Sequence, residues 1–209
     1  LLEILTHIGH SEKVFIMKRL LLILILTLSF QSIAKADDIK DLEIEGMSIG
    51  DSLLDFMSKE KIEKLKMTDY PNSKKFSRVT TIFPNMEIYE DVMIQFKTND
   101  KKYIIYAVDG GLYYENNIKS CYKKKDEIVK NISKQFPNLK TKKKSTTHSY
   151  DNESWTDSFY FYFKNGGLIE ITCLDWTKKV TNELNWVDNL AVRLMTEEFR
   201  TWLNTEAFD

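Results

Sequence analysis

The chain has 209 residues, of which 43% are hydrophobic and 29% are charged, and its formal net charge is −1. This length and apolar content suit one globular domain and exclude a disordered chain. The near-neutral charge gives no reason to expect a nucleic-acid partner.

Residues 17–36 have the parts of a secretory signal peptide in the right order. These parts are Met17, the basic pair Lys18 and Arg19, an apolar run over 20–30 and the small-x-small motif of Ala34 and Ala36. We therefore expect cleavage after Ala36, a leader outside the fold at 1–16 and a single exported domain at 37–209. The alternative is a retained membrane helix, but the apolar run is shorter than the roughly 20 residues that a spanning helix needs. We expect no transmembrane anchor after cleavage.

The first half of the exported domain is predicted to hold a helix and then strands. Residues 37–46 are acidic and are expected to be irregular. A helix is predicted from Ser48 to about Lys66, because Ser48 and Asp51 form a pair that resembles a capping box and an apolar stripe follows. Strands are predicted at 77–83, 92–96 and 102–108, with Asp109-Gly110-Gly111 closing the last one.

The second half repeats this order. A helix is predicted over 119–136 and a polar loop over 140–154. Strands at 159–163 and 168–174 are joined by a turn at Asn165-Gly166-Gly167. A strand at 190–194 and a last helix capped by Thr196 complete the chain.

These elements predict an α+β fold in which an antiparallel sheet carries its helices on one face. The stretches 48–108 and 119–174 each place a helix before a hairpin, which suggests two helix-plus-hairpin repeats.

Cys121 and Cys173 are predicted to form a disulfide. Cys121 lies on the apolar face of the helix at 119–136, and Cys173 alternates with Ile169 and Ile171 on one face of its strand. An even cysteine count in an exported chain suits one bridge. The alternative is two buried free thiols.

The outward face of the sheet is the predicted binding surface. If Ile105, Phe161, Ile171 and Val192 face the helices, the opposite face carries a second set of side chains. They are Tyr106, Tyr160, Tyr162 and Arg193, joined by Met93 and Met195. Tyr and Arg are enriched at binding hot spots. The alternative is that the loop at 140–154 buries these aromatic residues, or that they only stiffen the sheet by cross-strand pairing.

Two resemblances add to this interpretation. The export signal, the acidic start at 37–41 and the segment Ile44-Glu45-Gly46-Met47-Ser48-Ile49-Gly50-Asp51-Ser52-Leu53 resemble a group of small exported proteins of unknown function from marine alphaproteobacteria. That resemblance implies a bacterial envelope address. Gly46-Met47-Ser48 before a helix and a hairpin is similar to the repeat of the β-lactamase-inhibitor-protein-like fold, which implies helices on one sheet face and protein binding on the other. The outer-membrane members of that fold are anchored by a lipidated Cys. This chain has no corresponding Cys, so the resemblance does not imply a membrane anchor.

The candidate catalytic groups are few. His148 has Ser145 and Ser149 near it in sequence, but a solvated loop histidine is the simpler interpretation. A catalytic pair could be drawn from the carboxylates Glu87, Glu90, Asp91, Asp109, Asp157 and Asp175, although turn chemistry already accounts for Asp at strand ends.

Other ligand classes have weaker signals. No phosphate-binding glycine loop, paired helical His or Cys-x-x-Cys motif is present, so we expect no cofactor and no metal. The runs Lys123-Lys124-Lys125 and Lys142-Lys143-Lys144 could meet anionic lipid or polysaccharide, but solvated charge is the commoner reason. Trp155 and Trp176 could bind glycans.

The resulting hypothesis is a periplasmic or secreted binding module that uses the open sheet face for an envelope protein or a small ligand. The alternative is a small periplasmic hydrolase that uses carboxylates or His148.

Overall fold

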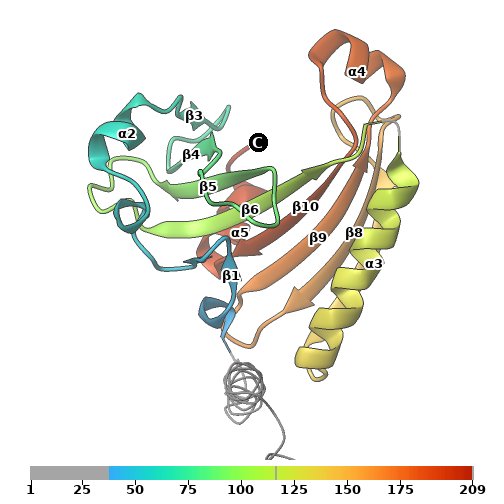
Figure 1. Ribbon diagram of the computed structural model, residues 1–209, viewed down its shortest axis with the longest axis horizontal. Helices are drawn as coiled ribbons and strands as arrows, with labels where there is room; N and C mark the ends of the chain where they lie inside the picture. The colour runs from blue at the N-terminus through green and yellow to red at the C-terminus, as the bar shows by residue number, and fades with distance from the viewer. Residues whose placement is uncertain (1–37, 116, 209) are drawn as a thin grey trace, which may run out of the picture. The chain divides into compact units, whose positions relative to one another are not determined.

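The central sheet has eight antiparallel strands in the part of the chain that the computed structural model describes, residues 38–115 and 117–208 (Figure 1). The spatial order is β3-β4-β5-β6-β10-β9-β8-β7. The strands are β3 Thr68–Asp69, β4 Phe76–Thr81, β5 Asp91–Lys97, β6 Ile105–Tyr113, β7 Lys140–Thr147, β8 Trp155–Tyr162, β9 Leu168–Asp175 and β10 Asn189–Met195. A two-stranded sheet pairs β1 Glu43–Ile44 with β2 Met47–Ser48.

Among the described residues, the helices are short except for one. They are the 3-10 turns η2 Ile39–Asp41 and η3 Leu53–Asp55, and the α-helices α2 Lys59–Lys64, α3 Ile118–Gln135, α4 Lys178–Leu184 and α5 Glu197–Thr205. The predicted α+β class with an antiparallel sheet is therefore confirmed. The predicted cleavage motif at Ala34 and Ala36 lies outside the described residues.

One face of the sheet, called here the α3 face, carries the larger core. Ile171 of β9 and Val192 of β10 are buried there, as is Phe161 of β8. The strands alternate, so every second side chain joins this core. Helix α3 packs along β9 and β10 (Figure 1).

A disulfide between Cys121 and Cys173 fixes α3 to β9, as predicted. The two cysteines are 52 residues apart in sequence and both are fully buried. Closing a loop of this length stabilises the fold by about 4 kcal/mol in the chain-entropy model.

Helix α5 departs from the expected arrangement, because it packs on the opposite face of the sheet. Phe199 and Trp202 of α5 form a second buried cluster with Phe76, Leu168 and Met195. Met195 and the buried Leu194 are neighbours on one strand, so they point to opposite faces. The strand-to-helix turn at Thr196, whose side chain caps α5 as predicted, brings the helix back onto this side, called here the α5 face.

The predicted helix from Ser48 to Lys66 is wrong over most of its length. Ser48 ends β2, and its N–H does donate to Asp51 Oδ2 at 2.8 Å, but this pair closes a turn. Gly50 has φ +98°, a conformation outside the helical region, and its N–H donates to Ile105 O. Only η3 and α2 are helical, and their apolar residues Leu53 and Ile62 still join the α3-face core.

Two further boundaries differ from expectation. Strand β6 continues through Asp109-Gly110-Gly111 to Tyr113, because these residues are paired on both sides by β5 and β10. The expected polar loop at 140–154 begins as strand β7, an edge strand that pairs with β8 over its whole length. Its sequence, Lys-Thr-Lys-Lys-Lys-Ser-Thr-Thr, contains no apolar residue, so the apolar/polar alternation that predicts a half-buried strand is absent.

Each half of the molecule supplies a helix followed by antiparallel strands, in line with the suggested repeats. Helix α2 precedes β3–β6, and α3 precedes β7–β9. Strand β10 then joins the halves by pairing with β6 on one side and β9 on the other.

Candidate binding site

A row of polar side chains crosses the middle of the α5 face. The strand register places Tyr160 opposite Glu170, Glu170 opposite Arg193, and Arg193 opposite Asp109. Arg193 Nε donates to Asp109 Oδ2 at 2.6 Å, and Arg193 Nη1 donates to Glu170 Oε2 at 3.2 Å. One guanidinium therefore joins carboxylates from the strands on both sides of it.

Asp109 is the member of this ion cluster that is shielded from water, whereas the side chains of Arg193 and Glu170 are 27% and 18% exposed. Asp109 is only 5% exposed, and its Oδ1 is buried with no hydrogen-bond partner in the described structure. Burial raises the pKa of Asp109 above its ordinary value, and the charge of Arg193 opposes this shift. Burial likewise raises the pKa of Tyr160 to about 12, with the charge of Glu170 adding to the effect. At neutral pH, Tyr160 is therefore an uncharged hydroxyl.

Small side chains next to this row produce a hollow. The next row across the sheet runs from Ser158 through Thr172 and Ala191 to Gly111. Ser158 and Thr172 are hydrogen-bonded to each other through their hydroxyls. A side chain at Gly111 would collide with the Asp91 carboxylate. Large residues in one row and small ones in the next leave a depression in the face.

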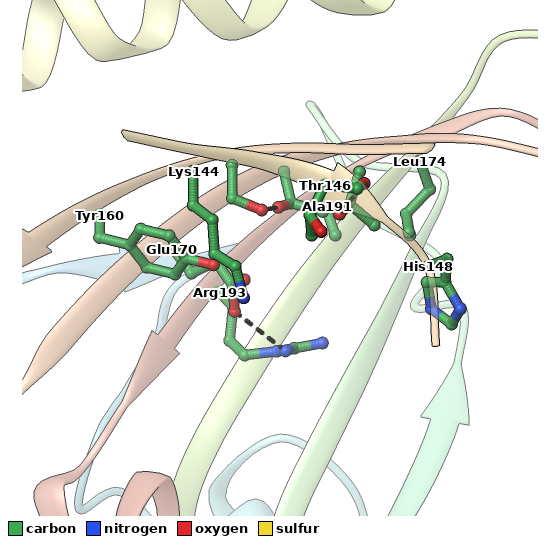
Figure 2. Close-up of a pocket in the computed structure, with 11 residues that line it drawn as sticks. Lys144, Thr146, His148, Tyr160, Glu170, Leu174, Ala191 and Arg193 are labelled. Carbon is green, nitrogen blue, oxygen red and sulfur yellow. Dashed lines mark hydrogen bonds and ion pairs between the residues drawn. The ribbon is translucent and has the colours of Figure 1, made fainter. Parts of the chain in front are cut away.

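The hollow has a volume of about 240 Å³, and nine of its eleven lining residues have polar or charged side chains (Figure 2). Lys144, Thr146 and His148 come from β7 and the residue after it. In Figure 2, Tyr160, Glu170, Arg193 and Lys144 lie toward the left of the hollow and His148 toward the right, with the ion pair of Arg193 and Glu170 drawn as a dashed line. The edge strand β7 thus supplies one wall of the hollow.

The four residues predicted to bind are divided between two places. Tyr160 and Arg193 line the hollow. Tyr106 and Tyr162 do not line the hollow; like Tyr160, they pack against the cluster beneath α5, where Tyr106 also contacts Phe76 edge-to-face. A bulge opposite Gln95 turns Tyr106 to the same side as Ala107. Because α5 covers this end of the face, the open surface is smaller than expected.

The two methionines expected on this face also divide. Met195 is buried under α5, and Met93 of β5 is half-buried. Neither of them lines the hollow.

His148 and Ser145 do not form a catalytic pair. Ser145 lies on the other face of β7, where its hydroxyl donates to Asp157 Oδ1 at 2.5 Å. His148 Nδ1 accepts the Tyr150 N–H at 3.1 Å, and Ser149 is exposed in the turn. Burial lowers the pKa of His148, so its ring is neutral at neutral pH. His148 is a wall of the hollow and not a free loop residue.

The predicted carboxylates do not converge on one point. Asp109 faces the α5 side, whereas Asp157 faces the α3 side and binds the buried Lys125. Asp175 ends β9 opposite Trp155. Glu87 and Glu90 are exposed, and Asp91 accepts the Tyr113 hydroxyl at 2.6 Å.

The carboxylate that joins Asp109 is Glu170, which the sequence analysis missed. Strand β9 has two charged residues, Asp175 at its end and Glu170 between Ile169 and Ile171, and that break in the apolar pattern is the signal that could have revealed Glu170.

Lys125 departs from the solvated form expected of the lysine runs, whereas Lys123, Lys142, Lys143 and Lys144 are exposed. Lys125 is 2% exposed and neutralises Asp157. Burial by itself would raise the pKa of the Asp157 carboxyl, but the hydrogen bond and charge of Lys125 lower it below its ordinary value. Lys142 and Lys144 point to the α5 face and Lys143 to the α3 face of β7.

Comparisons with known proteins add no relationship. No protein-family model, no curated protein and no solved structure matches the chain. Within residues 38–115 and 117–208, no group of three or more His, Cys, Asp or Glu side chains is arranged to hold a metal ion. None of the helices in these ranges has the length and hydropathy needed to cross a membrane.

Proposed function

We propose that this chain is an exported binding module that recognises its ligand in the polar hollow of the α5 face. Export is supported by the signal peptide expected at 17–36 and by the disulfide, since such bonds persist in oxidising compartments. The observation that carries the binding role is an ion cluster in which Arg193 and Glu170 line an open hollow and the buried Asp109 pairs with Arg193.

Stability alone is a poor reason for such a cluster. Burying charges costs desolvation energy, and well-packed apolar residues of similar size are often as stabilising. The neighbouring positions Leu168 and Met195 on the same face show that this sheet accepts apolar side chains. A charged floor beside an uncovered surface is better explained by recognition.

The size of the hollow limits what it can accept. Small-molecule sites usually have about 300–1,000 Å³, and 240 Å³ falls below that range. A single polar group fits this space better than a whole cofactor does. Asp109 and Glu170 already neutralise Arg193, so Lys144 and the His148 ring remain as donors at the rim. We therefore infer a ligand group that accepts hydrogen bonds, such as a carboxylate or amide side chain of an envelope protein.

The hydrolase alternative stays a prediction. It needs a nucleophile or a second acid close to His148, and Ser145 and Asp157 both lie on the other side of the sheet. No observation of the site favours it over binding.

Site-specific photo-crosslinking tests the proposal. A photoreactive amino acid replaces Thr146, which lines the hollow, or Thr147, its neighbour on the opposite face of the same strand. The full chain is then irradiated with an envelope extract of the producing cells. We expect a specific crosslinked product from position 146 that is lost in Glu170→Gln, a change that removes charge and keeps shape. Equal labelling from both positions, or none from position 146, would contradict the proposal.

A further inference from the structure

A line of aromatic rings lies at one end of the sheet. Ring centroids are 4.7 Å apart between His148 and Trp176, 4.8 Å between Trp176 and Trp186, and 5.0 Å between Trp186 and Tyr150. The rings come from two segments, the turn after β7 and the connection between β9 and β10 that contains α4. Figure 1 shows α4 standing beyond the ends of these strands.

The two segments are tied together by hydrogen bonds. Asp151 Oδ2 accepts from Ser154 Oγ at 2.6 Å and from Thr177 Oγ1 at 3.3 Å, and Thr177 N–H donates to Ser154 Oγ. Thr177 is the N-cap of α4. The side chain of Asp188 accepts the Trp176 N–H at 2.9 Å. The rings are therefore held in place before any ligand arrives, which lowers the entropic cost of binding.

The core does not account for this line of rings. Tyr150 is 55% exposed and Trp186 is 40% exposed, and neither belongs to a buried cluster. Exposed aromatic side chains gathered in one place usually mark an interaction site. Trp155, which the sequence analysis grouped with Trp176, contacts none of these rings.

A second hollow adjoins Trp176, with a volume of about 300 Å³. Its polar lining includes Glu115, Lys178, Asn182 and Asp188. The site thus combines an aromatic surface with carboxylate, ammonium and amide groups that can bond to hydroxyls in either direction.

This combination selects among ligand classes. A lipid chain would strip water from Asp188 and Glu115 without replacing their hydrogen bonds. A nucleotide could stack on Trp176, but its phosphates would meet these two carboxylates. A pyranose ring meets both requirements, because its C–H bonds carry partial positive charge toward the negative aromatic face and its hydroxyls pair with the polar rim.

We propose that Trp176, Trp186 and the adjoining hollow bind a neutral pyranose unit of a glycan. This site adjoins the hollow of the α5 face through His148, which lines that hollow and contacts Trp176, but the inference does not rest on the function proposed there. Such a pyranose unit can belong to a free oligosaccharide or to a surface polysaccharide.

The test uses the full chain and defined sugars. Cellotetraose, maltotetraose, laminaritetraose, mannotetraose and chitotetraose are titrated, and binding is followed by tryptophan fluorescence and by NMR shifts of the indole N–H groups. We expect at least one sugar to bind with Kd of about 1 mM or tighter. The matching insoluble polysaccharide is then pulled down with the chain. Binding to the polymer alone indicates a surface glycan, and binding to both indicates recognition of short chain ends.

Two variants locate the site. Trp186→Ala should weaken binding by about tenfold or more, as expected for an aromatic hot spot. Trp155→Ala is the matched control, because Trp155 is 41% exposed, close to the 40% of Trp186, and should leave the affinity unchanged. Failure of all five sugars and of their insoluble polysaccharides to bind, or an equal loss in both variants, would overturn the proposal. Near-UV circular dichroism confirms that each variant remains folded.

Discussion

Arg193 is the residue whose loss should affect the sheet most directly. It is the partner of Asp109, which is 5% exposed, and of Glu170. We expect Arg193→Met to lower the free energy of unfolding by about 3 kcal/mol, since removing one partner leaves an uncompensated buried charge. Urea unfolding at neutral pH measures this change.

A second substitution separates charge from packing. Asp109→Asn in the Arg193→Met background should recover more than half of the loss, because it removes the unpaired charge. In Arg193→Met itself, the folded-state pKa of Asp109 rises further above its unfolded value. The free energy of unfolding of Arg193→Met is then greatest at low pH, and it falls as the pH rises through the folded-state pKa of Asp109. A double variant no more stable than the single one would contradict this account.

Asp151 should give the opposite pH dependence. Although burial raises the pKa of Asp151, hydrogen bonds from Ser154, Glu153 and Thr177 lower it from 3.8 to about 2. Because the folded-state pKa is lowered, the stabilisation is complete above 3.8 and is lost as the pH falls toward 2. We expect Asp151→Asn to be less stable than the unmodified chain near neutral pH, with the difference shrinking near pH 2.

Denaturant unfolding of both proteins across this pH range measures the difference. Other carboxylates titrate equally in the two proteins, so subtraction isolates Asp151. A difference that stays constant with pH would show that the carboxylate charge is not what ties the loop to α4.

At the scale of elements, β7 is a long edge strand that needs protection. Its eight residues pair with β8 on one side only, and nearly all are exposed. Lys140, Lys142, Lys143 and Lys144 place charge along this edge, which opposes pairing with a second copy. We expect the replacement of all four by Gln to cause concentration-dependent self-association, measured by sedimentation velocity.

The matched control removes the same charge from a helix. Lys119, Lys123, Lys130 and Lys134 are exposed on α3, and their replacement by Gln should leave the sedimentation coefficient unchanged. Association of both variants would mean that net charge, and not the strand edge, keeps copies apart.

At the scale of the whole molecule, the two cores share their strands. Leu194 belongs to the α3-face core and the adjacent Met195 to the cluster under α5. Neither core can open without disrupting the strands of the other, so we expect one cooperative unfolding transition. Near-UV and far-UV circular dichroism should give the same midpoint in urea.

Trp202→Ala tests this coupling. Trp202 is 1% exposed, and its Nε1 donates to Ser73 Oγ at 2.8 Å. Its removal should cost about 3–5 kcal/mol and shift both midpoints together. Trp155→Ala should change stability by about 0.5 kcal/mol or less, as an exposed site does. Separate midpoints in Trp202→Ala would show that the cores unfold independently.

The local pattern of the sequence was enough to determine the antiparallel α+β fold and the cysteine pairing. The alternation in β9 and β10 and the helical spacing in α3 can each be recognised within a single element. Cys173 lies on the apolar face of β9, and Cys121 lies on the apolar face of α3. Thr196 was identifiable as a cap for the same reason, because capping depends on neighbouring residues.

Only the tertiary structure decided where the polar groups meet. Glu170, Arg193 and Asp109 come from three strands. Lys144 comes from β7, which was predicted as a loop because it contains no apolar residue. The sequence also did not show that α5 would cover Tyr106 and Tyr162, or that α4 would bring Trp186 to Trp176. Such contacts depend on the order of the strands in the sheet and on the face of the sheet onto which a connection folds. Both are set by packing between residues that are distant in sequence, which the local periodicity of hydrophobic residues does not reveal.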